Sequence, residues 1–357
     1  MPKSFKGLAL GIAAAAFTTL AVTGQPQAAT FKLTAGSSHP PIVPWAVALR
    51  DLIVPESTKR AKALGHTLEW TEAYSGVLYN FKNTLEGVQD GLADVGWVGT
   101  LWEPNKMPLH NVTYFAPFGT SNVQALLEIG RELHEKIPAM NQQWTKYNQK
   151  LLGVFATDAY ILMTKKPIKS VADLKGLKLF APGAVARWVE GTGAIGIDAG
   201  LPVYYNGIKT GVANGVISPT TGILPFKLHE VAPILTQLQM GGALPGALTM
   251  NLNTWKKLPP ELQKMFLELG NEYGDWVAKR VIGFYNKTVD VMKKNPKVDV
   301  SVLSMDQQRK WAKSVPNVAA EWVKRTEARG LPAGEVLKVY MDGMRARGEK
   351  PLRDWDK

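Results

Sequence analysis

Apolar and polar positions show two periodicities over the first hundred residues. Residues 31–36 and 66–74 alternate with a period of two, which predicts strands. Residues 44–64 and 78–91 place apolar side chains at helical spacing, and a short buried strand is expected over 93–98. This order of strand, helix, strand, helix and strand is typical of a mostly parallel sheet covered by helices on both faces.

A second α/β unit is expected after residue 149. The pattern predicts strands at 150–157, 159–165, 177–182 and 197–203, a helix at 184–193, and a helix followed by a strand over 204–218.

One long amphipathic helix is predicted over residues 258–295. It opens at Pro259 and Pro260, which suit a helix start. At a rise of ~1.5 Å per residue it would be roughly 50 Å long, more than the width of a small domain. The helix therefore either bridges two domains or bends at Gly270, Gly274 or Gly283. The residues after it are expected to be mostly helical.

The N-terminus, residues 1–29, has the pattern of an export signal. Lys3 and Lys6 precede an apolar stretch over 7–22, and Ala28–Ala29 would end the cleavage region. Gln27 makes the cleavage box imperfect, and an uncleaved anchor or a buried helix is the alternative. No later segment is a candidate membrane span.

Composition supports an exported globular protein. Of 357 residues, 45% are hydrophobic and 20% charged, and none is cysteine, so the fold would form without disulfides, as suits a bacterial periplasm. The net charge of +12 comes from dispersed Lys and Arg residues, which indicates a solvated basic surface rather than a nucleic-acid site.

The motifs that mark common enzymes give little support for catalysis. "GTGAIG" at 191–196 matches a dinucleotide fingerprint but follows a predicted helix and leads into a strand, so a turn is the better interpretation. The chain has no Walker loop, no G-x-S-x-G and no H-E-x-x-H, and its five histidines are scattered. We expect no cofactor, no metal site and no enzyme, although the members of a catalytic triad need not be near in sequence.

Aromatic side chains recur where predicted strands end. Each alone is more typical of a core, but several at the same end of two sheets would form an aromatic-walled cleft. The ones that carry this prediction are Trp97, Tyr114, Phe115, Phe118, Tyr160 and Phe180. The loop "SSHPP" at 37–41 follows the first strand and could place Ser38 and His39 at the same cleft.

Five segments, in this order and at this spacing, resemble the dicarboxylate-binding (DctP) type of substrate-binding protein from tripartite ATP-independent periplasmic (TRAP) transporters. They are "LEGVQDGLADVGWV", "YFAPF", "KKPIKSVADLKGLKLFAPG", "KTGVANGVISPTTGILPFKLHEVAPILT" and "MNLNTWKKLPPELQKMF". The resemblance implies two α/β domains hinged around a cleft, with a long helix spanning both. It also implies capture of a small solute, usually a carboxylate, and delivery to two membrane subunits, without enzymatic activity.

The resemblance also implies a division of the mature chain. Domain I is expected from residues 30–157 plus 246–285, and domain II from 158–245 plus 286–357. Hinges are expected near residues 157 and 245.

The sequence departs from the family pattern where the ligand carboxylate is usually bound. Phe180 stands at the position of the usual arginine, Tyr160 at that of a second arginine, and Asn214 and Ser218 alter the following stretch. Aromatic faces in place of a guanidinium indicate an aromatic or bulky monocarboxylate rather than a simple dicarboxylate. Arg187 is either a relocated anchor or a solvent-facing residue, in which case a neutral ring or a cation against π faces is the alternative ligand.

These considerations give a candidate ligand site and two rival functions. The expected ligand-binding residues are His39, Tyr74, Trp97 and Thr100 in the first domain, Tyr160, Phe180, Arg187, Ser218 and Thr221 in the second, and Asn251. The rivals are an exported hydrolase or lyase using the same cleft, and a ligand-sensing partner of a membrane kinase.

Overall fold

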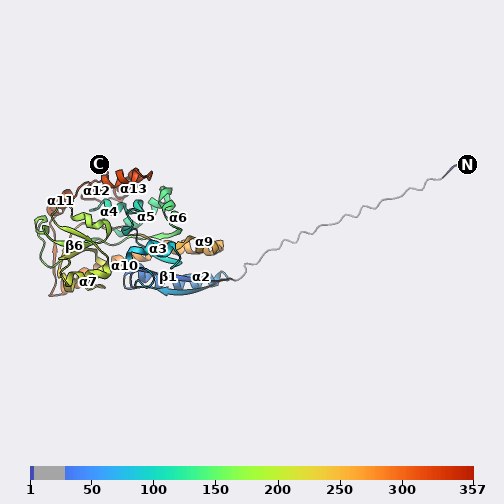
Figure 1. Cartoon of the computed structure of the whole chain (residues 1–357), viewed down its shortest axis with the longest axis horizontal. Helices are drawn as coiled ribbons and strands as arrows, with labels where there is room; N and C mark the ends of the chain where they lie inside the picture. Colours follow the sequence, from blue (N-terminus) through green and yellow to red (C-terminus); the bar gives the residue numbers. More distant parts are fainter. Residues whose placement is uncertain (4–28) are drawn as a thin grey trace.

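A computed structural model of the chain describes residues 1–3 and 29–357 and shows two α/β lobes, each built on its own sheet. The expected export signal therefore lies almost wholly outside the described residues. In Figure 1, β6 and α7 mark the second lobe at the left, and β1, α2 and α3 mark the first lobe toward the lower right.

The sheet of the first lobe has five strands within the described residues, in the order β2-β1-β3-β10-β4. Their bounds are β1 (Thr30–Gly36), β2 (Thr67–Ala73), β3 (Val95–Val98), β4 (Gln149–Val154) and β10 (Ala247–Asn251). β1 is parallel to β2 and β3, whereas β10 is antiparallel to both of its neighbours.

The sheet of the second lobe, again counted over the described residues, has six strands in the order β11-β9-β5-β8-β6-β7. Their bounds are β5 (Tyr160–Thr164), β6 (Lys178–Ala181), β7 (Ile195–Asp198), β8 (Gly215–Pro219), β9 (Ile234–Gln237) and β11 (Asp299–Val302). Only β5 runs against its neighbours. β5 and β10 are each the first strand after the chain has crossed from the other lobe, so the expected mostly parallel order is broken only where the lobes are joined.

Helices cover both sheets. The α-helices are α1 (Pro44–Ala48), α2 (Val54–Ala63), α3 (Thr84–Gln89), α4 (Val112–Phe115), α5 (Val123–Lys136), α6 (Pro138–Lys146), α7 (Leu201–Lys209), α8 (Leu228–Val231), α9 (Leu252–Lys257), α10 (Pro260–Lys294), α11 (Met305–Ser314), α12 (Val318–Glu327) and α13 (Ala333–Ala346). Shorter 3-10 turns that concern the site are η2 (Phe81–Asn83), η3 (Thr100–Trp102), η5 (Val171–Leu174) and η6 (Gly183–Val189).

Two local predictions differ from the structure. The helix expected over 184–193 is the 3-10 segment η6, which ends at Val189. The strand expected over 197–203 stops at Asp198, because Pro202 lies in the first turn of α7, where its missing N–H is not needed.

Helix α10 runs without a break for 35 residues and packs against β4 of the first sheet and β11 of the second. It therefore bridges the lobes, and the glycines within it do not interrupt it. Gly270 serves close packing instead: a Cβ at this position would lie 2.1 Å from the carbonyl oxygen of Leu152 in β4.

The residues after α10 contact both lobes. α11 packs against η5 of the second lobe, whereas α13 packs against α5 beside the first sheet. Arg347 reinforces the second contact by pairing with Glu128 and Glu132 of α5. The predicted domain boundary assigned all of 286–357 to the second domain, but α13 lies against an element of the first.

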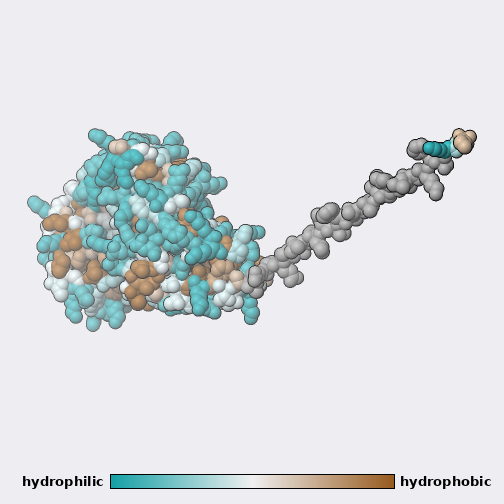
Figure 2. Space-filling view, turned by 45° about the vertical axis from the view of Figure 1, so that its right-hand side comes forward, coloured by the Kyte–Doolittle hydropathy of each residue, from teal (hydrophilic) through white to brown (hydrophobic). Residues whose placement is uncertain are grey.

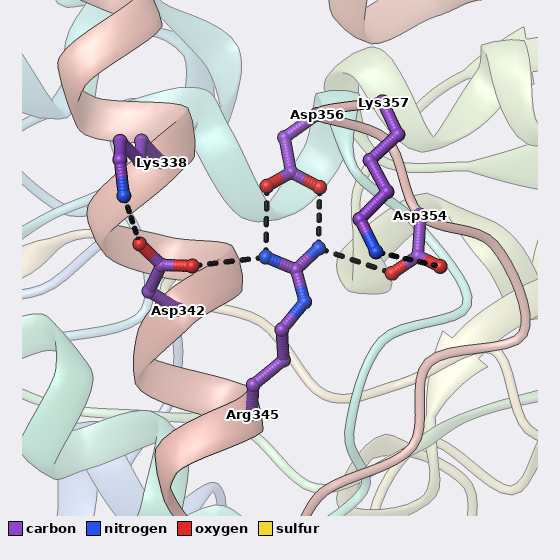
Figure 3. A network of polar contacts seen from close by, with 6 residues as sticks. All are labelled: Lys338, Asp342, Arg345, Asp354, Asp356 and Lys357. Carbon is purple, nitrogen blue, oxygen red and sulfur yellow. Dashed lines mark hydrogen bonds and ion pairs between the residues drawn. The ribbon is translucent and has the colours of Figure 1, made fainter.

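The C-terminal tail is held by one arginine (Figure 3). Arg345 of α13 donates hydrogen bonds to both carboxylate oxygens of Asp356, and also to Asp342 and Asp354. The indole of Trp355 lies buried beside them and donates to the Pro117 carbonyl at 2.6 Å. The tail thus closes over the segment that follows α4.

The surface is chiefly polar, as its charge predicts. Figure 2 shows a face that is mostly hydrophilic, with smaller hydrophobic areas between the charged side chains. Among the described residues, no helix combines the length and the hydropathy that a membrane span needs.

We predict that Arg345→Met lowers the free energy of unfolding by about 1 kcal/mol, because three carboxylates lose their shared partner. The loss should shrink in 1 M salt, which screens such pairs. Urea denaturation measures it. Lys310→Met, which removes a single exposed pair with Asp306, is the matched control and should change little. Equal effects of the two variants would contradict the role given to Arg345.

Candidate functional site

A cavity lies between the two lobes, and the space in and around it that no atom fills, part of it open to solvent, is about 390 Å³. Its wall takes residues from each lobe and from the segments that join them. The first lobe contributes His39, Trp45, Trp97, Leu101 and Trp102, the joining segments Thr157 and Pro245, and the second lobe Tyr160, Pro182, Leu201, Tyr204, Ser218 and Pro219.

The position of the cavity follows from the sheet topology. Trp97 lies in β3, His39 follows the end of β1, and Ser218 and Pro182 stand at the ends of β8 and β6. The carboxyl ends of parallel strands leave room for a ligand, since the chain departs there toward helices on opposite faces. The two sheets present these ends to each other.

The first-lobe wall is a cluster of aromatic rings around His39. The imidazole ring meets Trp97 edge to face, with 4.9 Å between the ring centroids, and stacks on Trp102, with 6.0 Å between the centroids. The ring centroid of Trp97 is also 5.8 Å from those of Trp45 and Trp102. These flat apolar faces suit a ring or another bulky hydrophobic body.

His39 is a neutral member of this wall. Burial lowers its pKa to about 3, because no carboxylate compensates the loss of water around the charged form. The Ser38 hydroxyl lies 3.0 Å from Nδ1 and fixes the ring. The imidazole therefore offers hydrogen bonds without a charge at neutral pH.

The hydroxyl groups of the wall already have partners within the protein. Tyr204 donates to the Ala199 carbonyl at 2.7 Å, and Ser218 to the Pro219 carbonyl at 3.2 Å. Tyr160 and Tyr114 face each other through their hydroxyl oxygens at 3.4 Å. These side chains shape the second-lobe wall, which is apolar apart from such paired groups.

Three indole N–H groups in the wall have no such partner. Within the described residues, the Nε1 atoms of Trp45, Trp97 and Trp102 are buried and make no hydrogen bond. Buried donors are normally satisfied by hydrogen bonds, so these three N–H groups are exceptions.

Two irregular segments, 155–159 and 238–246, join the lobes beside the cavity and bond to each other. Thr157 N donates to the Ala243 carbonyl at 2.8 Å, and Tyr160 N donates to that of Gly241 at 2.9 Å. Asp158 lies buried in the first segment and accepts hydrogen bonds from the backbone N–H and the hydroxyl of Thr221. Burial raises the pKa of Asp158 to about 7, although the bonds from Thr221 act in the opposite direction.

The structure brings together four of the residues expected from sequence. His39, Trp97, Tyr160 and Ser218 all line the cavity. Two more lie one layer behind the wall: Phe180 stacks on Tyr204 at 5.5 Å, and the Thr100 hydroxyl donates to the Pro245 carbonyl at 3.4 Å. Phe180 thus supports a wall residue, and it is not itself in the wall.

The other four expected residues lie elsewhere, and each has a local role. Tyr74 donates to Glu72 on the first-lobe surface, and Asn251 caps α9. Thr221 binds Asp158 at the joining segment. Arg187 pairs with Glu190 and Glu321 outside the cavity, because both carboxylates lie within reach of its guanidinium. Of the two alternatives for Arg187, a relocated anchor or a residue away from the ligand, this structure shows the second, since Arg187 does not line the cavity.

Sequence reasoning missed Trp45, Trp102 and Tyr204. From the sequence, Trp45 was expected on the apolar, core-facing side of a helix. The residue does lie in a helix, α1, which begins at Pro44, but its ring lines the cavity. Trp102 could have been found from the sequence "GWVGTLW", because it follows Trp97 by five residues, just after the end of the same strand. Tyr204 was hidden by the strand wrongly predicted over 197–203.

Metal-binding and charged groups do not gather at this site. No group of three or more His, Asp or Glu side chains is placed to hold a metal ion within residues 1–3 and 29–357. The wall residues include no Lys, Arg, Asp or Glu. The arrangement can therefore enclose and orient a small molecule through shape, aromatic contact and neutral hydrogen bonds.

Comparison with known proteins identifies similar sequences and folds. The sequence profile of the bacterial extracellular solute-binding proteins, family 7 (DctP), matches residues 62–326. A solute-binding protein of Sulfitobacter sp. is 31% identical over 139 residues, which are 38% of this chain and 42% of that protein. The match thus spans less than half the length of that curated relative.

Two solved structures share the fold. A TRAP solute-binding protein of Rhodoferax ferrireducens, in complex with copurified benzoate, has a TM-score of 0.77 and 20% identity, over 89% of this chain and 98% of that one. A marine metagenome TRAP solute-binding protein specific for aromatic acid ligands, in complex with 3-hydroxybenzoate, has a TM-score of 0.78 and 20% identity, over 89% and 99%.

We predict a pH signature for Asp158. The pKa of Asp158 is about 7 in the folded protein and ~3.9 in the unfolded chain, so the unfolded chain loses this proton first as pH rises. Between pH 4 and 7 the free energy of unfolding therefore falls, by at most about 1.4 kcal/mol per pH unit. The free energy of unfolding of Asp158→Asn should therefore rise relative to that of the unsubstituted protein over this range, as measured by urea denaturation at each pH.

Asp173→Asn is the contrasting control. Backbone N–H groups of Lys169 and Ser170 lower the pKa of Asp173, so this carboxylate stabilises the fold above pH 4 and the contribution is lost as pH falls. This variant should be less stable than the unsubstituted protein at pH 7, by a difference that narrows toward pH 3. A pH-independent difference for Asp158→Asn would contradict its burial as a titrating acid.

Proposed function

Because this chain belongs to the bacterial extracellular solute-binding proteins of family 7, we propose that it is a periplasmic receptor that closes its two lobes over a small aromatic or bulky monocarboxylate. The receptor then delivers this acid to the membrane subunits of a TRAP transporter. The observation that carries the proposal is the aromatic-walled cavity to which both lobes contribute. Its role is binding, as in the rest of this family of binding proteins.

The chemistry of the wall supports the choice of ligand. Indole and phenol rings provide large, flat contact areas for a ring or a branched body. A dicarboxylate would bury a second charge in a wall that has no cation. The similar proteins in complex with benzoate and 3-hydroxybenzoate are consistent with a ligand of this kind.

Contacts at the mouth of the cavity support closure as the mechanism. Gly183 of the second lobe lies against the Leu101 carbonyl of the first, and Lys82 pairs with Asp198 at 3.6 Å across the same rim. These contacts would be lost if the lobes moved apart. A ligand that touches both lobes favours the closed state by its extra contacts there, which is a population shift. The segments 155–159 and 238–246, which contain both expected hinge positions, would absorb the motion.

Export to the periplasm rests on the N-terminal pattern and on the family. Lys3, Lys6 and the apolar stretch over 7–22 are typical of a leader, and the family is described as extracellular. An exported enzyme in the same cleft would convert its ligand, whereas a receptor would release it unchanged after denaturation.

We predict that aromatic monocarboxylates stabilise the protein more than dicarboxylates do. Benzoate, 3-hydroxybenzoate and mandelate should each raise the melting temperature in a thermal-shift assay, and succinate and malate should not. A ligand at ~100 times its Kd adds about 2.7 kcal/mol to the free energy of unfolding. The largest shift with succinate or malate would refute the proposed ligand class.

We predict that Gly183→Ala weakens binding of the best of these acids by about tenfold or more. Gly183 has a φ of +52°, and an added Cβ would lie 2.1 Å from the Leu101 carbonyl oxygen, so the substitution obstructs closure. Gly176→Ala is the matched control: its φ is +79°, but nothing lies within 4 Å of an added Cβ. Calorimetric titration separates the two, and an equal change in Kd would argue against closure at this contact.

A further inference from the structure

We propose that the carboxylate of the ligand is bound by the indole N–H groups of Trp45, Trp97 and Trp102, which act together as a neutral anion site. This inference rests on the proposed function, since it names the groups that hold the acid within the same cavity. It assigns to three tryptophans the task for which a guanidinium would otherwise be expected.

The first observation is that these three donors are both buried and unpaired. Among the described residues, their Nε1 atoms have no hydrogen-bond partner, and all three side chains line the cavity. Trp45 and Trp97 are 4% and 2% exposed, so bulk water does not reach them freely. The donors come from three separate elements, α1, β3 and η3, which converge on one wall.

The second observation is that this fold satisfies buried indoles elsewhere. Four tryptophans outside the cavity donate to backbone carbonyls at 2.6 to 3.0 Å; they are Trp188, Trp311, Trp322 and Trp355. Buried polar groups are rarely left without partners in native proteins. Of the ten buried side-chain N and O atoms without a partner among the described residues, these three are the ones that line the cavity, which indicates an acceptor that arrives with the ligand.

The third observation is that the other polar groups of the wall are already engaged or neutral. The hydroxyls of Tyr204, Ser218 and Thr157 donate to backbone carbonyls. His39 is held by Ser38 and can add one neutral hydrogen bond. No cation lines the cavity, so the indole donors, together with His39 and the Tyr160 hydroxyl, are the groups left to hold a carboxylate.

The direction of these dipoles decides between the two ligand charges. An N–H donor attracts an acceptor, and a carboxylate accepts several hydrogen bonds at once. A quaternary ammonium ion would gain from the ring faces but would leave all three donors unpaired. The unpaired donors thus favour an anion. The neutral wall also limits that anion to one carboxylate, since a second would lie buried without a partner.

The test compares single Trp→Phe substitutions, which keep a ring and remove the N–H. Trp45→Phe, Trp97→Phe and Trp102→Phe should each weaken binding of the tightest of benzoate, 3-hydroxybenzoate and mandelate by roughly 10- to 100-fold. Trp70→Phe is the control, because Trp70 lies outside the cavity and donates to Ser57. It should leave Kd unchanged in calorimetric titration.

A spectroscopic readout on the unsubstituted protein covers the case in which a variant fails to fold. With 15N-labelled tryptophan, addition of the acid should shift the indole proton signals of Trp45, Trp97 and Trp102 downfield and leave that of Trp70 in place. The variants that fold assign the signals.

The outcomes separate this inference from the proposed function. If none of the three acids binds, the proposed function fails. If an acid binds but the indole signals and the Kd values of the Trp→Phe variants do not change, the proposed function stands and the indole site is refuted. Tighter binding of benzyltrimethylammonium than of any of the acids would overturn the assignment of an anion.

Discussion

The structure depends on how the two sheets are joined. The segments 155–159 and 238–246 run side by side, and Thr157 bonds to Ala243 while Tyr160 bonds to Gly241. Each segment then enters the opposite sheet as its single reversed strand, β5 or β10. Because both sheets are tied to the same pair of segments, their carboxyl-end edges face each other, and the space between them becomes the cavity. The unbroken helix α10 packs against both sheets and limits how far they can separate.

The cavity that results has no charged side chain among its wall residues. Its wall has aromatic rings from both lobes, hydroxyls that already donate to backbone carbonyls, and an imidazole that burial keeps neutral. The unpaired indole groups are the exception to this balance. A desolvated N–H donor without a hydrogen bond raises the free energy of the protein, and it binds an acceptor strongly when one is present. The same groups can therefore favour both the presence of the ligand and the closed position of the lobes.

The fold was largely predictable from sequence, whereas the site was predictable only in part. Periodicity located strands β1 to β8, since alternation and turns are local properties, but it gave no prediction for β9, β10 or β11. His39, Trp97, Tyr160 and Ser218 were expected at the cleft because strand ends in such sheets meet at one edge, and all four line the cavity. Asn251 lies outside the wall because its amide donates to the backbone of Val88, which is far away in the sequence. Arg187 pairs with the distant Glu321 and also with Glu190, whose proximity in the sequence did not show that the two side chains meet. Trp45 resembled a core residue, and only the three-dimensional packing shows that its N–H lacks a partner.

The most direct test of this account is a crystal structure of the protein with its tightest-binding aromatic acid. The account predicts that the lobes enclose the acid and that its carboxylate oxygens lie ~2.7–3.2 Å from the indole nitrogens of Trp45, Trp97 and Trp102. A carboxylate bound to Arg187, or one that points away from all three indoles, would contradict it.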